Sequence, residues 1–241
     1  MSDAIIVEDL RHRYGGLDVL KGVSFTVHAG EVFGILGPNG AGKTTLSSIL
    51  TSQLRPTSGS VSLLGLDPVS RGGELRRRIG LAAHELRMSE HLTGLQALRF
   101  QGHLYGLHGF SLEKRIRELI KTVGLDHKQD GLIGSYSEGM KRRLNVALSL
   151  VHDPEVVFLD EPTSGLDAAS ERAVTEALGH LMKGRTSIVI AHHLATIRNA
   201  DVIFVMKDTD IVERGTHEQL LARGGVYAEL YAIQAGNEVV P

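Results

Sequence analysis

The sequence predicts an α/β protein whose central sheet is mostly parallel. Apolar runs of strand type occur at residues 31–36, 155–159, 187–190 and 202–206, and stretches of helical character separate them. Strands that alternate with helices along a chain form mostly parallel sheets that helices cover. A glycine-rich segment directly after the first run is a second indication, because phosphate-binding loops occupy that place in α/β proteins.

The order of the remaining elements predicts one domain with an insertion. Residues 4–9 and 23–36 are β-rich, with a polar turn at 14–18, and residues 61–64 form a short strand pattern. Residues from about 87 to 152 lack strand signals, and apolar side chains lie there at helical spacing. We therefore predict a single domain over residues 1–241, a helical insertion at about 87–152 and a frayed tail at 236–241. The apolar helical face comprises Leu112, Ile116, Leu119, Ile120 and Val123.

The composition excludes several classes of protein. A net charge of −2 provides no basic field for nucleic acid, and the absence of cysteine excludes disulfides and thiolate metal sites. No apolar stretch approaches the ~18 residues that a membrane-spanning helix needs, and the first residues lack a signal-peptide pattern. We therefore expect a soluble chain, with any membrane-spanning part supplied by a partner.

Residues 37–45 fit the phosphate-binding loop pattern G-x-x-x-x-G-K-[ST]. The glycines let backbone N–H groups point toward phosphate oxygens, and the following helix adds its positive end. Lys43 can reach the β- and γ-phosphates, and the Thr44 hydroxyl can hold Mg²⁺. The alternative is a glycine-rich turn that matches by chance, and the flanking strand and helix disfavour it. The expected nucleotide-binding residues of this loop are Gly37, Pro38, Asn39, Gly40, Ala41, Gly42, Lys43, Thr44 and Thr45.

Two acidic residues, Asp160 and Glu161, directly follow the apolar run at residues 155–159. Ligands of open α/β sheets collect at the carboxyl ends of the strands, which is where both side chains fall. Asp160 would hold the metal through water. Glu161 would act as general base on the attacking water, a role that contributes ~10²–10⁴-fold in rate. An ordinary Asp-Glu-Pro turn explains the segment equally well in isolation, but the phosphate loop in the same sheet favours catalysis.

Three segments together resemble the nucleotide-binding domain of ATP-binding cassette (ABC) transporters: residues 37–45, 136–143 and 160–167. Ser137-Glu-Gly139 stands where the family has the signature written LSGGQ, just ahead of a helix. The resemblance extends from about residue 4 to residue 233. It implies a P-loop NTPase core of the RecA-like type, with an N-terminal antiparallel β subdomain and an inserted helical subdomain. It also implies binding of ATP and Mg²⁺ and hydrolysis of the ATP.

The signature segment has a physical interpretation as well. Ser137 is an N-cap type of residue, and a hydroxyl, backbone N–H groups and the helix dipole together make an anion site. In the family, two cassettes pair head to tail, so that each ATP lies between one phosphate loop and the partner's signature. The resemblance assigns Ser137 and Gly139 to the γ-phosphate. Tyr136, Glu138 and Met140 depart from the family pattern, and we expect Glu138 to point away from the phosphate. The alternative is an ordinary capped amphipathic helix.

The resemblance assigns roles to three further residues. His192, just past the run at 187–190, matches the switch histidine that bonds the γ-phosphate and holds the water. Asp167 matches the loop that reaches the partner's site. Tyr14 matches the aromatic residue that stacks on adenine, with a half-buried strand tyrosine as the alternative.

One position departs from the family in a way that bears on metal binding. The family places a glutamine that touches Mg²⁺ where this chain has His84. Mg²⁺ prefers hard oxygen ligands, so we expect His84 to act through water or only in coupling, and we do not assign it to the metal. The basic runs at 76–78 and 141–143 are expected to form solvated faces.

The resemblance implies the ATP-hydrolysing subunit of a membrane transporter. Its partners would be a second cassette protomer, in a homodimer or a heterodimer, and integral membrane subunits, with the chain lying peripherally at the cytoplasmic face. ATP binding would close the pair of cassettes and hydrolysis would reopen it. A soluble cassette ATPase that clamps nucleic acid or ribosomes is the alternative. The chain has no coiled-coil pattern and no basic arm, so no nucleic acid is expected.

Two segments differ in the subclass of transporter that they resemble. Residues 136–143 resemble separately encoded exporter ATPases, whereas residues 215–231 resemble cassettes that are fused to their membrane domain. The mixture favours export and leaves open whether the chain is a separate subunit or part of a fused transporter. In the family the membrane part selects the cargo, so no residue here predicts it.

Overall fold

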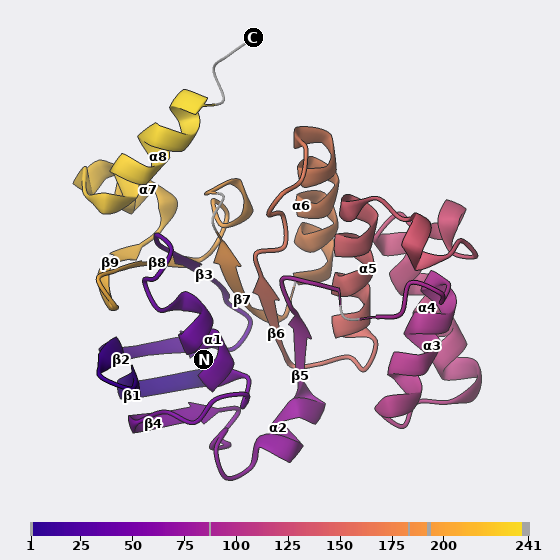
Figure 1. Ribbon diagram of the computed structural model, residues 1–241, viewed down its shortest axis with the longest axis horizontal. Helices are drawn as coiled ribbons and strands as arrows, with labels where there is room; N and C mark the ends of the chain where they lie inside the picture. The colour runs from indigo at the N-terminus through magenta and orange to yellow at the C-terminus, as the bar shows by residue number, and fades with distance from the viewer. Residues whose placement is uncertain (1, 87, 183, 192–193, 238–241) are drawn as a thin grey trace.

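A six-stranded sheet forms the centre of the molecule in the computed structural model, which describes residues 2–86, 88–182, 184–191 and 194–237 (Figure 1). The strand order is β5-β6-β7-β3-β8-β9. Neighbouring strands run parallel except β9, which pairs antiparallel with β8. The strands are β3 (Val32–Leu36), β5 (Ile79–Ala82), β6 (Val156–Asp160), β7 (Thr186–Ala191), β8 (Val202–Lys207) and β9 (Asp210–Gly215).

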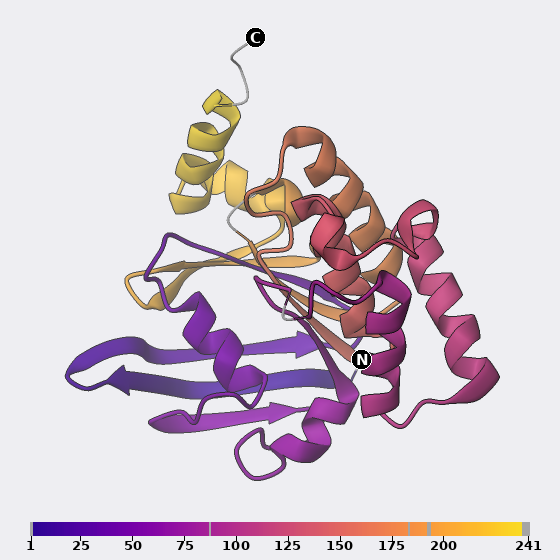
Figure 2. The ribbon, with the colours of Figure 1, turned by 45° about the vertical axis from the view of Figure 1, so that its right-hand side comes forward.

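A second, antiparallel sheet of order β2-β1-β4 lies beside this core, as predicted for the amino-terminal part. It consists of β1 (Asp3–Tyr14), β2 (Leu17–His28) and β4 (Ser58–Leu63). Figure 2 shows these strands, in indigo and purple, as a separate layer below the central sheet. The turn between β1 and β2 falls in the predicted segment 14–18. The strand expected at 61–64 begins three residues earlier, because Ser58, Ser60 and Val61 pair with β1.

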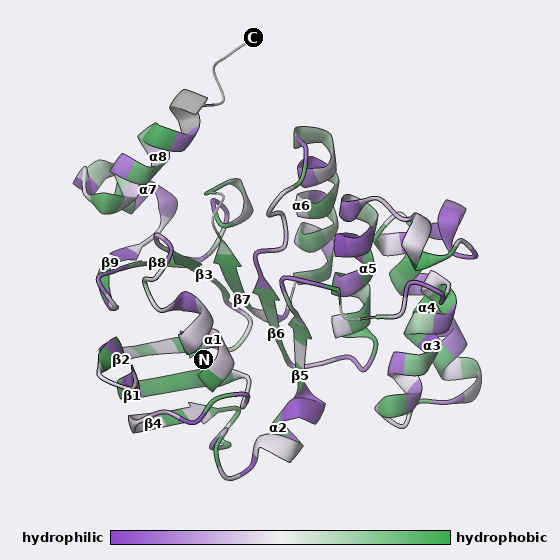
Figure 3. Ribbon diagram, in the orientation of Figure 1, coloured by the Kyte–Doolittle hydropathy of each residue, from purple (hydrophilic) through white to green (hydrophobic). Residues whose placement is uncertain are grey.

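The central sheet is covered on both faces. Along β6, Val156 and Phe158 enter the core shared with the antiparallel sheet and α1 (Lys43–Leu50). Val157 and Leu159 enter the other core, which contains residues of α5 (Glu138–Leu150) and α6 (Ala168–Met182). Because successive side chains of a strand point to opposite faces, α1 and α5 lie on opposite sides of the sheet. Figure 3 shows the central strands as the most uniformly hydrophobic part of the chain.

Helices occupy the chain between β5 and β6. They are α3 (Gly94–Leu104), α4 (Gly109–Thr122), the 3₁₀ turns η1 (Asp126–Lys128) and η2 (Ile133–Ser135), and α5, while α2 (Gly72–Arg78) precedes β5. Thr93 and Gln96 form a capping box that starts α3. The predicted apolar face of α4 is confirmed, because Leu112, Ile116, Leu119, Ile120 and Val123 are all buried.

The carboxyl-terminal part packs against β9. It contains α7 (His217–Arg223) and α8 (Val226–Asn237), whereas η3 (Leu194–Thr196) lies between β7 and β8 in the chain. The Glu213 carboxylate accepts hydrogen bonds from the backbone N–H groups of Val226 and Tyr227, at 2.7 and 3.0 Å, and so caps the start of α8. α8 continues to Asn237, inside the tail expected to fray, and residues 238–241 lie outside the described part. In the described ranges, no helix is long and apolar enough to cross a bilayer.

Candidate nucleotide-binding site

The loop at residues 37–42 joins β3 to α1 and requires glycine at two positions for steric reasons. A Cβ atom at Gly37 would lie 2.3 Å from the Met206 carbonyl oxygen on the neighbouring strand β8. Gly42 has φ +96°, and a Cβ atom there would lie 2.6 Å from the carbonyl oxygen of Val19. Any larger residue would push the loop away from the sheet or force a strained backbone. The close packing of the loop on β8 and β2 therefore requires glycine at positions 37 and 42.

Lys43 is folded back into this loop. Its side chain is buried, and Nζ donates hydrogen bonds to the carbonyl oxygens of Gly37 at 2.7 Å and Pro38 at 3.0 Å. Burial lowers the pKa of Lys43, while Glu161 and Asp160 act in the opposite direction. Lys43 lines a hollow of about 160 Å³ together with Val19, Glu161 and the other residues of 39–45. A phosphate in that hollow would meet the lysine and the backbone of the loop.

Asp160 ends β6 and Glu161 follows it. Both residues therefore lie at the edge of the sheet where the phosphate loop follows β3. β7 separates β6 from β3, so the carboxylates face the phosphate loop across one strand. Asp160 and Thr44 line a second cleft of about 590 Å³ together with His84. Burial raises the pKa of Asp160, and the neighbouring Glu161 raises it further. A cation at this place would offset the repulsion between the two carboxylates.

The donors in this cleft fit Mg²⁺. Thr44 offers a hydroxyl and Asp160 a carboxylate, and both are the hard oxygen ligands that Mg²⁺ prefers. Across the described ranges, histidine and acidic side chains do not form a cluster of three or more that could hold a metal ion. Mg²⁺ is usually held by one or two protein oxygens together with water and substrate phosphates.

Glu161 occupies an unusual backbone position. Its φ is +50°, in the left-handed region that residues other than glycine rarely adopt. Its N–H group donates to the carbonyl oxygen of Ile190 on β7 at 2.8 Å, which holds the strand end in place. Strained backbone of this kind clusters at functional sites. The Glu161 side chain is 19% exposed, and its Oε2 atom lies 3.3 Å from His84 Nδ1.

The signature segment starts α5, as predicted. The Ser137 hydroxyl accepts a hydrogen bond from the Met140 N–H at 3.3 Å and caps the helix. The Glu138 carboxylate is exposed and lies 3.5 Å from Lys141 Nζ. Gly139 packs closely against α6, because a Cβ atom there would lie 2.9 Å from Cβ of Ser170. Since α5 and α1 cover opposite faces of the sheet, one chain does not join its signature to its phosphate loop.

Asp167 caps α6. Its carboxylate accepts hydrogen bonds from the N–H groups of Ala169 and Ser170, both at 3.0 Å, and from the Ser170 hydroxyl at 2.7 Å. These bonds, chiefly those from Ser170, lower the pKa of Asp167. The segment that follows Glu161 is therefore fixed against α6, next to Gly139.

Two predicted site residues remain, Tyr14 and His192. Tyr14 ends β1 with 53% of its surface exposed, and its ring meets the buried His12 ring edge to face at 4.6 Å between centroids. An exposed aromatic face of this kind can stack on a base. His192 lies outside the described residues.

The basic run at 141–143 was expected to be solvated, and this is wrong, because all three residues are only partly exposed. Burial lowers the pKa of the Arg142 and Arg143 side chains. Arg143 Nη1 donates to the carbonyl oxygens of Val123 and Gly124 at the end of α4. Sequence reasoning missed these contacts because α4 and α5 come together only in the folded chain.

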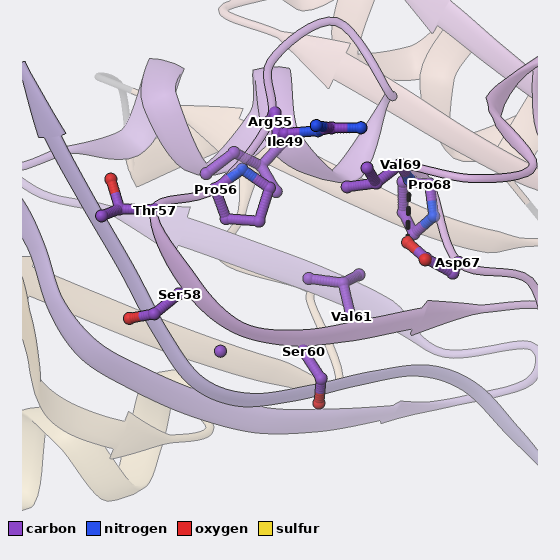
Figure 4. Close-up of a pocket in the computed structure, with 11 residues that line it drawn as sticks. Ile49, Arg55, Pro56, Thr57, Ser58, Ser60, Val61, Asp67, Pro68 and Val69 are labelled. Carbon is purple, nitrogen blue, oxygen red and sulfur yellow. Dashed lines mark hydrogen bonds between the residues drawn. The ribbon is translucent and has the colours of Figure 1, made fainter.

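A separate hollow of about 480 Å³ lies beside β4 and the loop at residues 67–69 (Figure 4). Ile49, near the carboxyl end of α1, is among its lining residues. The eight residues of α1 span about 12 Å. The hollow is thus at the opposite end of this helix from the phosphate loop, and we do not include it in the nucleotide site.

Comparison with known proteins agrees with this geometry. Residues 20–164 match the family described as ABC transporter. The doxorubicin resistance ATP-binding protein DrrA of Mycobacterium tuberculosis is 38% identical over 92% of this chain and 68% of its own length. The ATP-binding protein NatA of Bacillus subtilis is 34% identical over 83% of each chain. A bacterial Atm1-family ABC exporter with ATP bound has a TM-score of 0.81 and 28% identity, covering 96% of this chain and 41% of its own.

The chain belongs to the ABC transporter family. It is the ATP-binding and ATP-hydrolysing part of such a transporter, which confirms the predicted family, fold class and activity. Family membership also implies a paired cassette and a membrane-spanning transporter part as partners.

Proposed function

We propose that this chain powers an exporter through ATP-driven pairing with a second cassette, head to tail. The opposite placement of α1 and α5 is the observation that carries this proposal. Each chain offers one open phosphate loop and, on the far side of the sheet, one capped helix start. Two chains facing each other would place the helix start of one over the phosphate loop of the other. A homodimer and a heterodimer with a related cassette satisfy this geometry equally.

Each predicted residue then has a task at the nucleotide. The backbone of residues 37–45 and the Lys43 ammonium would bind the β- and γ-phosphates, once Lys43 leaves the Gly37 and Pro38 carbonyl oxygens. Thr44 and Asp160 would hold Mg²⁺, which would neutralise charge on the phosphate oxygens. Glu161 would orient and deprotonate the attacking water, and His192 would hold this water at the γ-phosphate. Tyr14 would stack on adenine.

The partner's residues complete the same site. Ser137 and Gly139 at the start of α5 would contact the γ-phosphate that is bound to the other chain, and Asp167 would reach across the pair. Binding of two ATP molecules would therefore close the pair, and hydrolysis would release it. The exposed position of the Glu138 carboxylate agrees with its pointing away from that phosphate.

Export is supported by the names of the relatives. Similar proteins include a doxorubicin resistance ATP-binding protein, a linearmycin resistance ATP-binding protein and an Atm1-family exporter. We therefore place the chain at the cytoplasmic face of a membrane, bound to integral membrane subunits that move a substrate outward. The closing and opening of the cassettes would be passed to those subunits as motion.

Glu161→Gln tests this function directly. The variant keeps the size of the side chain and removes the base, so it should bind ATP normally and lose about 10²–10⁴-fold in turnover. With ATP and Mg²⁺ it should elute from gel filtration as a stable dimer. The unmodified chain in ADP is the control and should elute as a monomer. A variant that hydrolyses ATP at the normal rate, or that stays monomeric in ATP and Mg²⁺, would contradict the proposal.

A further inference from the structure

One polar cluster joins three segments to which the proposed function gives different tasks. His84 Nδ1 lies 3.3 Å from Glu161 Oε2 and 3.5 Å from Arg142 Nη2. His84 belongs to the loop after β5, Glu161 follows β6, and Arg142 lies in α5 close to the signature. Arg142 Nη2 is also 3.5 Å from the Ser164 carbonyl oxygen, in the segment that leads to Asp167. One guanidinium group thus contacts the histidine beside the general base and the segment after that base.

The imidazole of His84 can serve only one of its two neighbours through Nδ1. With a proton on Nδ1, the ring attracts the Glu161 carboxylate, whose Oε2 atom lies 3.3 Å away. Without that proton, the same atom accepts from the Arg142 guanidinium. Arg142 and the Glu161 carboxylate therefore compete for the same atom of His84.

Helix α5 contacts the loop after β5 at a second point. Asn145, three residues after Arg142 on α5, donates from Nδ2 to the Ala83 carbonyl oxygen at 2.6 Å. Residues three apart lie on one face of a helix, so Asn145 and Arg142 form a two-point contact with residues 83–84. A shift of α5 would therefore move the backbone of this loop together with its histidine.

Arg142 is the least satisfied member of the cluster. Its Nη1 atom is buried, and within the described ranges it has no hydrogen-bond partner. A buried donor without an acceptor destabilises the folded state. A rearrangement of α5 that supplies an acceptor would therefore stabilise the Arg142 side chain.

We infer that His84 is a positioning residue for the Glu161 carboxylate, and that Arg142 transmits movement of the signature helix α5 to it. The inference rests on the proposed function, in which Glu161 serves the ATP of its own chain while α5 serves the ATP of the partner. Binding of the partner's nucleotide to α5 would then change the position of the general base of this chain, through Arg142 and His84. The two ATP sites of a pair would in this way be coupled inside each chain.

Substitution of His84 tests the first half of the inference. In the full chain with ATP and Mg²⁺, His84→Ala should lower kcat about 10-fold and leave KM for ATP within twofold, because the base is misplaced while the phosphate loop is intact. His84→Asn should restore most of the rate, because its amide nitrogen falls near the place of Nδ1. His84→Gln carries its amide further out and should restore less. A purely structural role would not give this order.

Arg142 has a matched control on the same helix. Arg142→Ala should lower kcat about fivefold, and adding it to His84→Ala should give no further loss, because both act through Glu161. Lys141→Ala removes a neighbouring cation that pairs with Glu90 and Glu138 and should leave kcat unchanged. Thermal unfolding of each variant monitors folding.

The possible outcomes separate this inference from the proposed function. If Glu161→Gln abolishes turnover while His84→Ala and His84→Asn both turn over normally, the positioning role is wrong and the proposed function stands. If the losses from His84→Ala and Arg142→Ala multiply, the two residues act independently and the link to α5 is wrong. If Glu161→Gln itself turns over normally, the proposed base fails and the inference fails with it.

Discussion

The sequence predicts an anion site at the start of α1 and another at the start of α5. The two helix starts differ in how far their backbone N–H groups are free to bind an anion. α1 begins after Gly42, which has no side chain to cap the helix, and its first turn holds no acidic residue. α5 begins after Ser137, whose hydroxyl already accepts from a backbone N–H group, and its first turn holds Glu138. The free N–H groups and the positive helix end are thus available at α1 and partly used at α5.

This difference shows what each half of a nucleotide site can do alone. The phosphate loop has a hollow beside it, a buried lysine and two carboxylates at the same sheet edge, so we expect it to bind nucleotide in a single chain. The start of α5 has an exposed carboxylate and a serine that serves its own helix. We therefore expect α5 to bind phosphate only when a second cassette presents ATP to it.

The largest expected effect comes from removing the charge at α1. Lys43→Ala should lower ATP affinity more than about 100-fold, because the phosphates lose a buried cation inside the loop. Isothermal titration of the isolated chain with ATP measures this directly. Lys21→Ala, at an exposed lysine that bonds the Asp208 carbonyl oxygen, is the control. Normal ATP affinity in Lys43→Ala would refute the assignment of residues 37–45.

A smaller effect is expected at α5. Ser137→Ala should reduce turnover about 10-fold and leave the ATP affinity of a single chain unchanged, because the hydroxyl faces the partner's nucleotide only in a pair. It should also cost about 1 kcal/mol of unfolding free energy through loss of the cap. Turnover and chemical denaturation separate the two effects. A fall in single-chain ATP affinity would show that α5 contacts its own nucleotide.

Asp160→Asn should stabilise the fold while it impairs turnover. Burial raises the pKa of Asp160 above that of the unfolded chain, so the ionised carboxylate destabilises the folded state at neutral pH. The variant should therefore melt a few degrees higher at pH 7 in EDTA. The difference should shrink as the pH falls through the raised pKa, since the carboxyl group then becomes neutral in the folded chain. Asp126→Asn, at an exposed position, should not change the melting temperature.

The smallest effect is expected from Glu138→Gln. If the carboxylate points away from the phosphate, its removal should change turnover less than twofold. It should lower the unfolding free energy by about 0.5 kcal/mol, because a negative charge at a helix start is favourable. A large increase in turnover would instead show that Glu138 faces the partner's ATP and opposes its binding.

Local sequence determined much of this molecule. The phosphate loop, the pair Asp160 and Glu161, the cap at Ser137 and the buried face of α4 were all predictable. Each depends on residues that are close in sequence: a turn that only glycine allows, a strand that ends in a carboxylate, a hydroxyl beside a free N–H group, and a helical period. β9 was missed because its side chains alternate between exposed and partly buried, so it lacks an apolar run.

Tertiary structure decided the contacts between segments that are far apart in the chain. The packing of Gly139 on Ser170, the placement of α1 and α5 on opposite faces, and the approach of His84 to Glu161 and Arg142 appear only when the sheet is assembled. The physical reason is that these contacts join residues tens of positions apart, so their geometry follows from strand order and helix packing. The local sequence shows which side chains are present, whereas the fold determines which of them come into contact.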